Sequence, residues 1–145
     1  MARPDLVTTL SSETDHVRRA LDDVRDKLNE MPEFQAIGDT TQIILAEVLN
    51  NVVEHAYRFQ PGHPIEVTLS FAEEALNCRV VDQGVAMPKG KPPNGGMPEI
   101  DPNSPDDLPE GGFGWAMIHM MTDGLSYTRK DGCNELFFSI PNTLN

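Results

Sequence analysis

Residues 46–57 read AEVLNNVVEHAY. Glu47, Asn51 and His55 recur every four residues, which places them on one face of a predicted helix. The opposite side is apolar and carries Leu45, Leu49, Val52 and Ala56. A polar stripe is usually a solvated face, but on a mostly apolar helix it can line a cavity. A carboxylate beside an amide then suits a general base next to a magnesium ligand, because Mg²⁺ prefers oxygen.

The helical pattern of this stretch extends from about residue 40 to 59 and is closed by Pro61–Gly62. An earlier amphipathic helix is predicted by apolar residues at steps of four, three and four, and it ends near Met31–Pro32. Its apolar face consists of Val17, Leu21, Val24 and Leu28. Each helix is preceded by a pair that resembles a capping box, Ser12 with Asp15 and Asp39 with Gln42. A third helix is predicted over residues 112–122.

Strand patterns fill most of the remaining sequence. Residues 64–71 alternate between apolar and polar side chains, and residues 76–81 form a second strand close enough for an antiparallel hairpin. Further strands are predicted at 6–10, 125–128 and 135–140, the last two joined by a turn at Asp131–Gly132. This order predicts an α+β fold, a two-layer sandwich with a mostly antiparallel sheet covered on one face by helices. No boundary divides residues 1–145, so we expect one domain.

Composition narrows the possible functions. The net charge of −12 disfavours nucleic-acid binding through phosphate neutralisation. No apolar run approaches the roughly 20 residues that span a bilayer, and the N-terminus lacks a signal-peptide pattern. We therefore expect a cytoplasmic protein that does not enter a membrane. Cys78 and Cys133 are expected to be free thiols.

Two glycine-containing motifs follow the helix that contains Glu47. Asp82-Gln83-Gly84 comes at a strand end, where a carboxylate can accept a hydrogen bond from a purine amine and a glycine lets backbone approach a flat ring. Gly111-Gly112-Phe113-Gly114 opens a helix, whose free N–H groups attract phosphate. Taken alone, a turn explains the first motif and a hinge or cap explains the second. Their order after the Glu-x-x-x-Asn helix makes the combination more specific.

With these motifs in this order, the chain resembles the GHKL superfamily, which has the Bergerat fold of histidine-kinase-like ATPases. Within that superfamily it is most similar to the bacterial anti-sigma-factor serine/threonine kinases, through AEVLNNVVEHAY and the closing run NELFFSIP. The resemblance implies ATP and Mg²⁺ as cofactors, with Glu47 as catalytic base and Asn51 as magnesium ligand. It implies that Asp82 binds the adenine amine above Gly84. The other implied nucleotide-binding positions are His55, Gly111, Gly112, Phe113 and Gly114.

The resemblance also implies an activity and partners. The expected reaction is phosphorylation of an anti-anti-sigma antagonist by a homodimeric kinase that also sequesters a sigma factor. The Pro-rich segment at about 85–110 would be the ATP lid. It contains acidic Asp101, Asp106, Asp107 and Glu110 with only Lys89 and Lys91 as basic side chains, which keeps open a non-catalytic, ATP-gated binding module. A GHKL ATPase, in which Glu47 activates water, is a further alternative, as is an unrelated α+β domain. His16 is expected to be an ordinary surface histidine.

Overall fold

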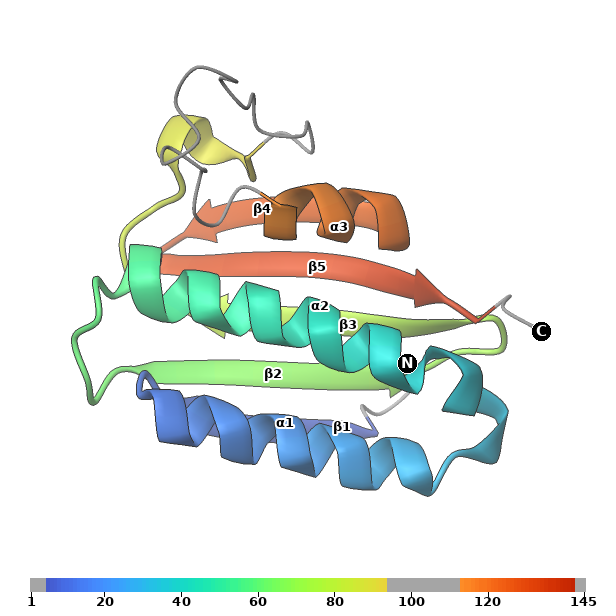
Figure 1. The fold of residues 1–145 in the computed structure, drawn as a ribbon. Helices are drawn as coiled ribbons and strands as arrows, with labels where there is room; N and C mark the ends of the chain where they lie inside the picture. Colours follow the sequence, from blue (N-terminus) through green and yellow to red (C-terminus); the bar gives the residue numbers. More distant parts are fainter. Residues whose placement is uncertain (1–4, 94–112, 143–145) are drawn as a thin grey trace, which may run out of the picture.

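The five strands form one sheet (Figure 1). The computed structural model describes residues 5–93 and 113–142. The strand order is β1-β2-β3-β5-β4, and every neighbouring pair is antiparallel. The strands are β1 Leu6–Ser11, β2 Pro64–Phe71, β3 Ala75–Asp82, β4 Asp123–Lys130 and β5 Cys133–Pro141. The predicted α+β sandwich with a mostly antiparallel sheet is therefore confirmed.

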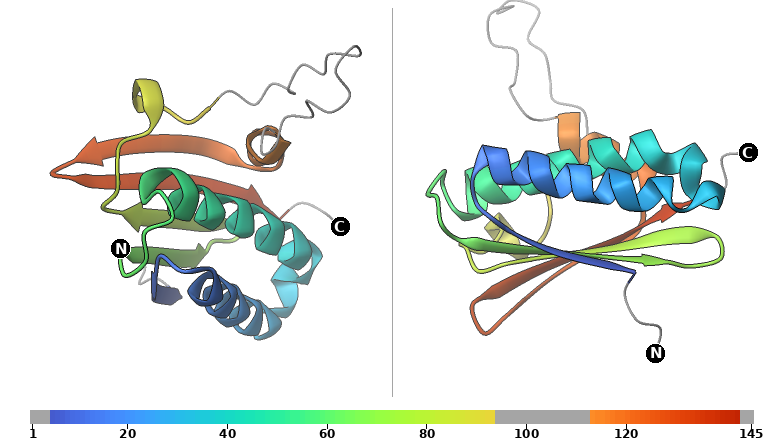
Figure 2. Two further views of the ribbon diagram at one scale, coloured as in Figure 1. Left: turned by 60° about the vertical axis from the view of Figure 1, so that its left-hand side comes forward. Right: turned by 90° about the horizontal axis from the view of Figure 1, so that it is seen from below.

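The helices lie on one face of this sheet, as the view from below in Figure 2 shows. The long helices are α1 Thr14–Asn29, α2 Gly38–Asn51 and α3 Phe113–Met121. Short helical segments are η1 Pro32–Ile37, the π-helical turn η2 Val52–Ala56 and η3 Pro88–Gly90. The helix expected from 40 to 59 thus ends in a wider turn, with Tyr57 N donating to Val52 O at 3.0 Å. In the described part of the chain, no helix has both the length and the apolar composition needed to cross a membrane.

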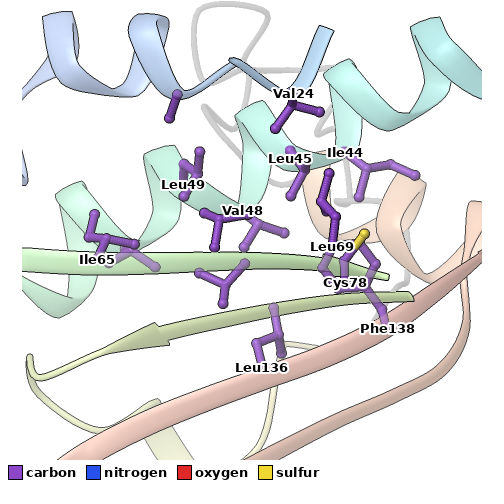
Figure 3. Close-up of a cluster of buried hydrophobic side chains, with 14 of the residues drawn as sticks. Val24, Ile44, Leu45, Val48, Leu49, Ile65, Leu69, Cys78, Leu136 and Phe138 are labelled. Atoms are coloured by element: carbon purple, nitrogen blue, oxygen red, sulfur yellow. The ribbon is translucent and has the colours of Figure 1, made fainter. Parts of the chain in front are cut away.

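The core lies between α1, α2 and the inward face of the sheet (Figure 3). Leu45 and Leu49 of α2 are fully buried, with Leu45 near Leu69 of β2 and Leu49 on the side of Ile65. Val24 closes the cluster from α1. The periodicity of the two predicted helices therefore identified the faces that pack on the sheet.

Both cysteines are free, as expected. Cys78 is buried in the core, and burial raises the pKa of its thiol far above the ordinary value. Asp131 and Gly132 adopt positive φ angles of 53° and 79°, as the predicted two-residue hairpin requires.

The two capping-box predictions were wrong. Neither α1 nor α2 has a side-chain cap hydrogen bond. The Ser12 hydroxyl instead donates to Gln60 O at 2.6 Å and accepts from His63 N at 3.1 Å, so it joins the start of α1 to the loop before β2. Gln42 Nε2 donates to Leu21 O at 3.1 Å and ties α2 to α1. Tertiary partners outcompeted the local caps at both sites.

Replacing Leu69 with alanine should destabilise the protein by about 2–5 kcal/mol, because the side chain is fully buried and its loss leaves a cavity. Val7→Ala on the neighbouring strand is the matched control, since Val7 is 51% exposed and should change stability by less than about 1 kcal/mol. Urea unfolding measures both. Equal losses in the two variants would contradict this assignment of the core.

Candidate functional site

Helix α2 supplies the first two predicted site residues, Glu47 and Asn51. Both side chains are half-buried. Asn51 Nδ2 donates to Glu47 O at 2.8 Å, within the same helix. This bond fixes the orientation of the amide and leaves Oδ1 as the atom that could coordinate a cation. An amide oxygen one helical turn from a carboxylate fits the oxygen preference of Mg²⁺.

The first turn of α3 lies against the carboxyl group of Glu47. A Cβ atom built on Gly114 would lie 2.3 Å from Glu47 Oε2 and 2.9 Å from Cδ, far inside contact distance. Only glycine therefore fits at this position while Glu47 keeps its place. The contact brings the Glu47 carboxylate beside the N-terminal end of a helix, where partial positive charge gathers.

The second predicted motif lies against the other end of the same helical stretch. A Cβ on Gly84 would lie 2.4 Å from Ala56 O and 2.7 Å from Ala56 Cβ. Val85 N also donates to Ala56 O at 2.9 Å. The sequence suggested that this glycine makes room for a flat ring, whereas the structure shows that packing on the helix already requires it.

The two glycine contacts define the dimensions of the site. Glu47 and Ala56 are nine residues apart in sequence, or about 13 Å along a helix with a rise of 1.5 Å per residue. One end has a carboxylate at the end of β3, and the other end has Glu47, Asn51 and the start of α3. A base at the first end and phosphates at the second match the extended shape of a nucleoside triphosphate. The residues present therefore fit ATP with Mg²⁺.

Asp82 ends β3 and is buried, at 6% exposure. Its Oδ1 accepts from Gly84 N at 2.8 Å and from Asn134 Nδ2 at 2.7 Å. Burial raises the pKa of Asp82 above its ordinary value, while these two bonds and the positive charge of Arg129 oppose that rise. The protein thus places a carboxylate in a partly dehydrated site, where hydrogen bonding to a base is strong.

Sequence reasoning missed three residues that hold this region together, namely Asn134, Arg129 and Tyr127. Asn134 is 4% exposed and lies directly opposite Asp82 in the β3–β5 register. Its Nδ2 also donates to Val85 O at 2.9 Å, and its Oδ1 accepts from Arg129 Nη1 at 2.9 Å and from the Tyr127 hydroxyl. A signal was available: Asn134 occupies the inward phase of the β5 alternation, where Leu136, Phe138 and Ile140 are apolar.

Tyr57, the last residue of AEVLNNVVEHAY, holds the segment that follows β3. Its hydroxyl donates to Pro64 O at 2.5 Å and accepts from Gln83 N at 2.7 Å. Burial is the main cause that raises its pKa, so the phenol stays protonated. Tyr57 thereby fixes the backbone between Asp82 and Gly84.

The remaining predicted residues are not brought into this cluster by the structure. The side chain of His55 lies in the π-helical turn and is 68% exposed, with its Nε2 3.9 Å from Glu54 Oε1. Its nucleotide-binding role stays a prediction. Gly111, Gly112, the side chain of Phe113 and the lid beyond Pro93 lie outside the described residues. His16 lies on α1, where its Nδ1 accepts from Ser11 N at 3.4 Å.

Gly84→Ala should destabilise the protein by about 2 kcal/mol or more, because the added methyl meets backbone atoms of Ala56 that cannot move independently. Gly38→Ala is the control, since a Cβ there meets nothing within 4 Å and alanine favours helix. Thermal unfolding of the two variants compares them. An unchanged melting temperature in Gly84→Ala would contradict the close approach.

Asp82→Asn should raise stability at neutral pH and abolish ATP-dependent stabilisation. The folded state binds the Asp82 proton more tightly than the unfolded chain, so its contribution favours folding below the ordinary pKa of 3.8 and is lost as pH rises through the raised value. The stability gained by the variant should therefore grow as pH rises through that value and then level off.

On the predicted role of Asp82 as the partner of the adenine amine, the same substitution should also remove nucleotide binding. The asparagine oxygen would accept from Gly84 N and Asn134 Nδ2, which turns an amide donor toward the donating amine of the base. Asp123→Asn, at an exposed position of β4, is the control. Urea unfolding between pH 4 and 8, with and without ATP, measures both effects, and an ATP response like wild type would refute the assigned role.

Comparison with known proteins places these motifs in a family. The model of the histidine kinase-like ATPase domain matches residues 10–140. The serine/threonine-protein kinase BtrW of Bordetella bronchiseptica is 35% identical over 99 residues, which cover 67% of this chain and 66% of that protein.

Among solved structures, the RsbU and RsbW domains of Rv1364c from Mycobacterium tuberculosis match 96% of this chain and 32% of theirs, with a TM-score of 0.64 and 17% identity. That likeness concerns the fold. The chain spans about two thirds of the length of its curated relative and about one third of the mycobacterial chain. The chain belongs to the family of histidine kinase-like ATPase domains.

Proposed function

We propose that this domain binds ATP with Mg²⁺ and transfers the γ-phosphoryl group to a serine or threonine of a partner protein. The observation that carries the proposal is the position of the Glu47 carboxyl group against Gly114, one helical turn from Asn51. The similarity to a protein named serine/threonine kinase supports a hydroxyl as the acceptor. The family membership supports ATP as the donor.

The residues of α2 divide the chemistry between them. Asn51 would hold Mg²⁺ through Oδ1, and the ion would neutralise charge on the phosphate oxygens. Glu47 would accept the proton that the acceptor hydroxyl loses as its oxygen bonds to the γ-phosphorus, while the bond from that phosphorus to the β–γ bridging oxygen breaks and ADP leaves. The half-buried position of Glu47 and its contact with α3 hold the carboxylate in one place, as a positioned base requires.

Asp82 would orient the nucleotide from the other end of the helix. Its Oδ1 is already used by Gly84 and Asn134, so Oδ2 would accept from the adenine amine. Gly84, held against Ala56, would form the floor below the ring. Binding of the base would thus place the phosphates at Glu47 and Asn51.

The partners follow from the same family resemblance. We propose an anti-anti-sigma antagonist as the phosphorylated substrate, a sigma factor as the sequestered partner, a homodimer as the assembly and the cytoplasm as the location. The alternative of a non-catalytic binding module rests on the acidic residues of the lid, all of which lie outside the described residues. The ATPase alternative uses the same Glu47 and is separated from the kinase by the assay below.

Glu47→Gln should lower the rate of phosphoserine or phosphothreonine formation by about 100-fold or more, because glutamine keeps the shape but cannot accept the proton. The assay combines the protein, ATP, Mg²⁺ and a candidate antagonist, and mass spectrometry detects the modified residue. ATP should stabilise wild type and variant alike in thermal unfolding. Glu54→Gln, an exposed change on the adjoining turn, should retain the wild-type rate.

Different failures point to different conclusions. Equally little phosphoprotein with wild type and Glu47→Gln would refute the kinase. Phosphate release by wild type without any modified protein would establish the ATPase instead. Absence of stabilisation by ATP or ADP with Mg²⁺ would refute the nucleotide site itself.

A further inference from the structure

A polar cluster on the β4–β5 hairpin holds the segment that follows Asp82. The cluster consists of Asn134, Arg129 and Tyr127. Arg129 Nη1 donates to Gly84 O at 2.6 Å, Asn134 Nδ2 donates to Val85 O at 2.9 Å, and Met87 N donates to the Tyr127 hydroxyl at 3.0 Å. The hairpin therefore binds the backbone of Gly84, Val85 and Met87.

Asn134 is the centre of this cluster because both ends of its amide are used. Nδ2 donates to the Asp82 carboxylate at 2.7 Å, and Oδ1 accepts from Arg129 at 2.9 Å and from the Tyr127 hydroxyl. These two donors to Oδ1 fix the amide so that its nitrogen faces Asp82. Asn134 is nearly fully buried, so water cannot readily replace a lost bond.

We propose that Asn134 is the positioning residue of the base-binding site: without contacting the nucleotide, it holds the Asp82 carboxylate so that Oδ2 faces the base. This inference depends on the proposed binding of ATP and adds a residue to that site. Arg129 and Tyr127 act through Asn134 by keeping its donor toward Asp82. The predicted base contact at Asp82 thus depends on a strand that is 52 residues later in the sequence.

Substitution by aspartate gives a test that separates positioning from simple support of the fold. Asn134→Asp places a second carboxyl group at the 2.7 Å position beside Asp82 Oδ1. Two carboxyl groups this close share one proton, which raises the upper pKa of the pair. While the proton is shared, the introduced group can still donate to Asp82. As pH rises and the proton is lost, repulsion replaces the bond.

The other charged and titratable groups around Asp82 do not reproduce this behaviour. Arg129 of β4 lies near Asp82 in wild type and variant alike, and Tyr57, which follows α2 and the π-helical turn, has a raised pKa because it is buried. Cys133 of β5 acts on Tyr57 and is unchanged in the variant. A pH-dependent loss of binding that is absent in wild type therefore reports the introduced carboxyl group.

The experiment measures the affinity for ATP with Mg²⁺ by calorimetry between pH 6.5 and 9, for wild type and Asn134→Asp. The ratio of the two dissociation constants cancels the titration of ATP itself. We expect the dissociation constant of Asn134→Asp, divided by that of wild type, to rise at least about tenfold from pH 6.5 to pH 9. Asn77→Asp adds the same charge on the outward face of β3 and should give a constant ratio.

Unfolding of both variants without nucleotide provides a second readout: Asn134→Asp alone should lose stability as pH rises. A constant affinity ratio for Asn134→Asp would overturn the proposal while wild-type binding of ATP left the proposed function intact. Failure of wild type to bind ATP would overturn both.

Arg129→Gln covers the case in which Asn134→Asp does not fold, because Arg129 is exposed. Arg129→Gln shortens the side chain and removes one of the two donors that fix the Asn134 amide, so the affinity for ATP with Mg²⁺ should fall below that of wild type. An affinity equal to that of wild type would overturn the role of the cluster.

Discussion

The arrangement of this domain depends on two places where the chain approaches one helical stretch with no side chain between. Gly84 meets the backbone of Ala56, and Gly114 meets the carboxyl group of Glu47. Each contact fixes a separate element, the segment after β3 in one case and α3 in the other. The sheet and its apolar core make α2 rigid, so the two contacts set the distance between the two ends of the site.

Periodicity predicted most of the elements because α2 and the inner strands bury clean apolar faces. The motif order predicted that both glycine motifs belong with the helix of Glu47, and the contacts of Gly114 with Glu47 and of Gly84 with Ala56 bring them there. The nucleotide-binding roles of these residues stay predictions. Local patterns failed where a residue bonds to a distant partner, as at Ser12 with Gln60 and His63. Asn134 could be recognised from the sequence as a polar residue in the inward phase of β5, but its place opposite Asp82 is revealed by the strand register.

The buried polar groups near Asp82 oppose folding unless each has a partner. In the described part of the chain, no buried side-chain nitrogen or oxygen lacks a hydrogen bond. Asn134 is a partner for several of these groups at once, since it bonds a carboxylate, backbone oxygens and two side-chain donors. A fully bonded cluster of this kind limits the number of arrangements open to Asp82. The hydrogen bonds that offset the free-energy cost of burying the Asp82 carboxylate therefore also fix its orientation.

The π-helical turn at Val52–Ala56 has a consequence for comparing related sequences. The turn sets the rotation about the helix axis between Glu47 and Ala56. Both glycine contacts therefore form only when these two residues are nine positions apart. One inserted or deleted residue between them would rotate one contact by about 100° relative to the other. Relatives that keep both contacts should therefore align here without gaps. A gap between these positions would mark a chain in which the segment after β3 and α3 are placed differently relative to each other.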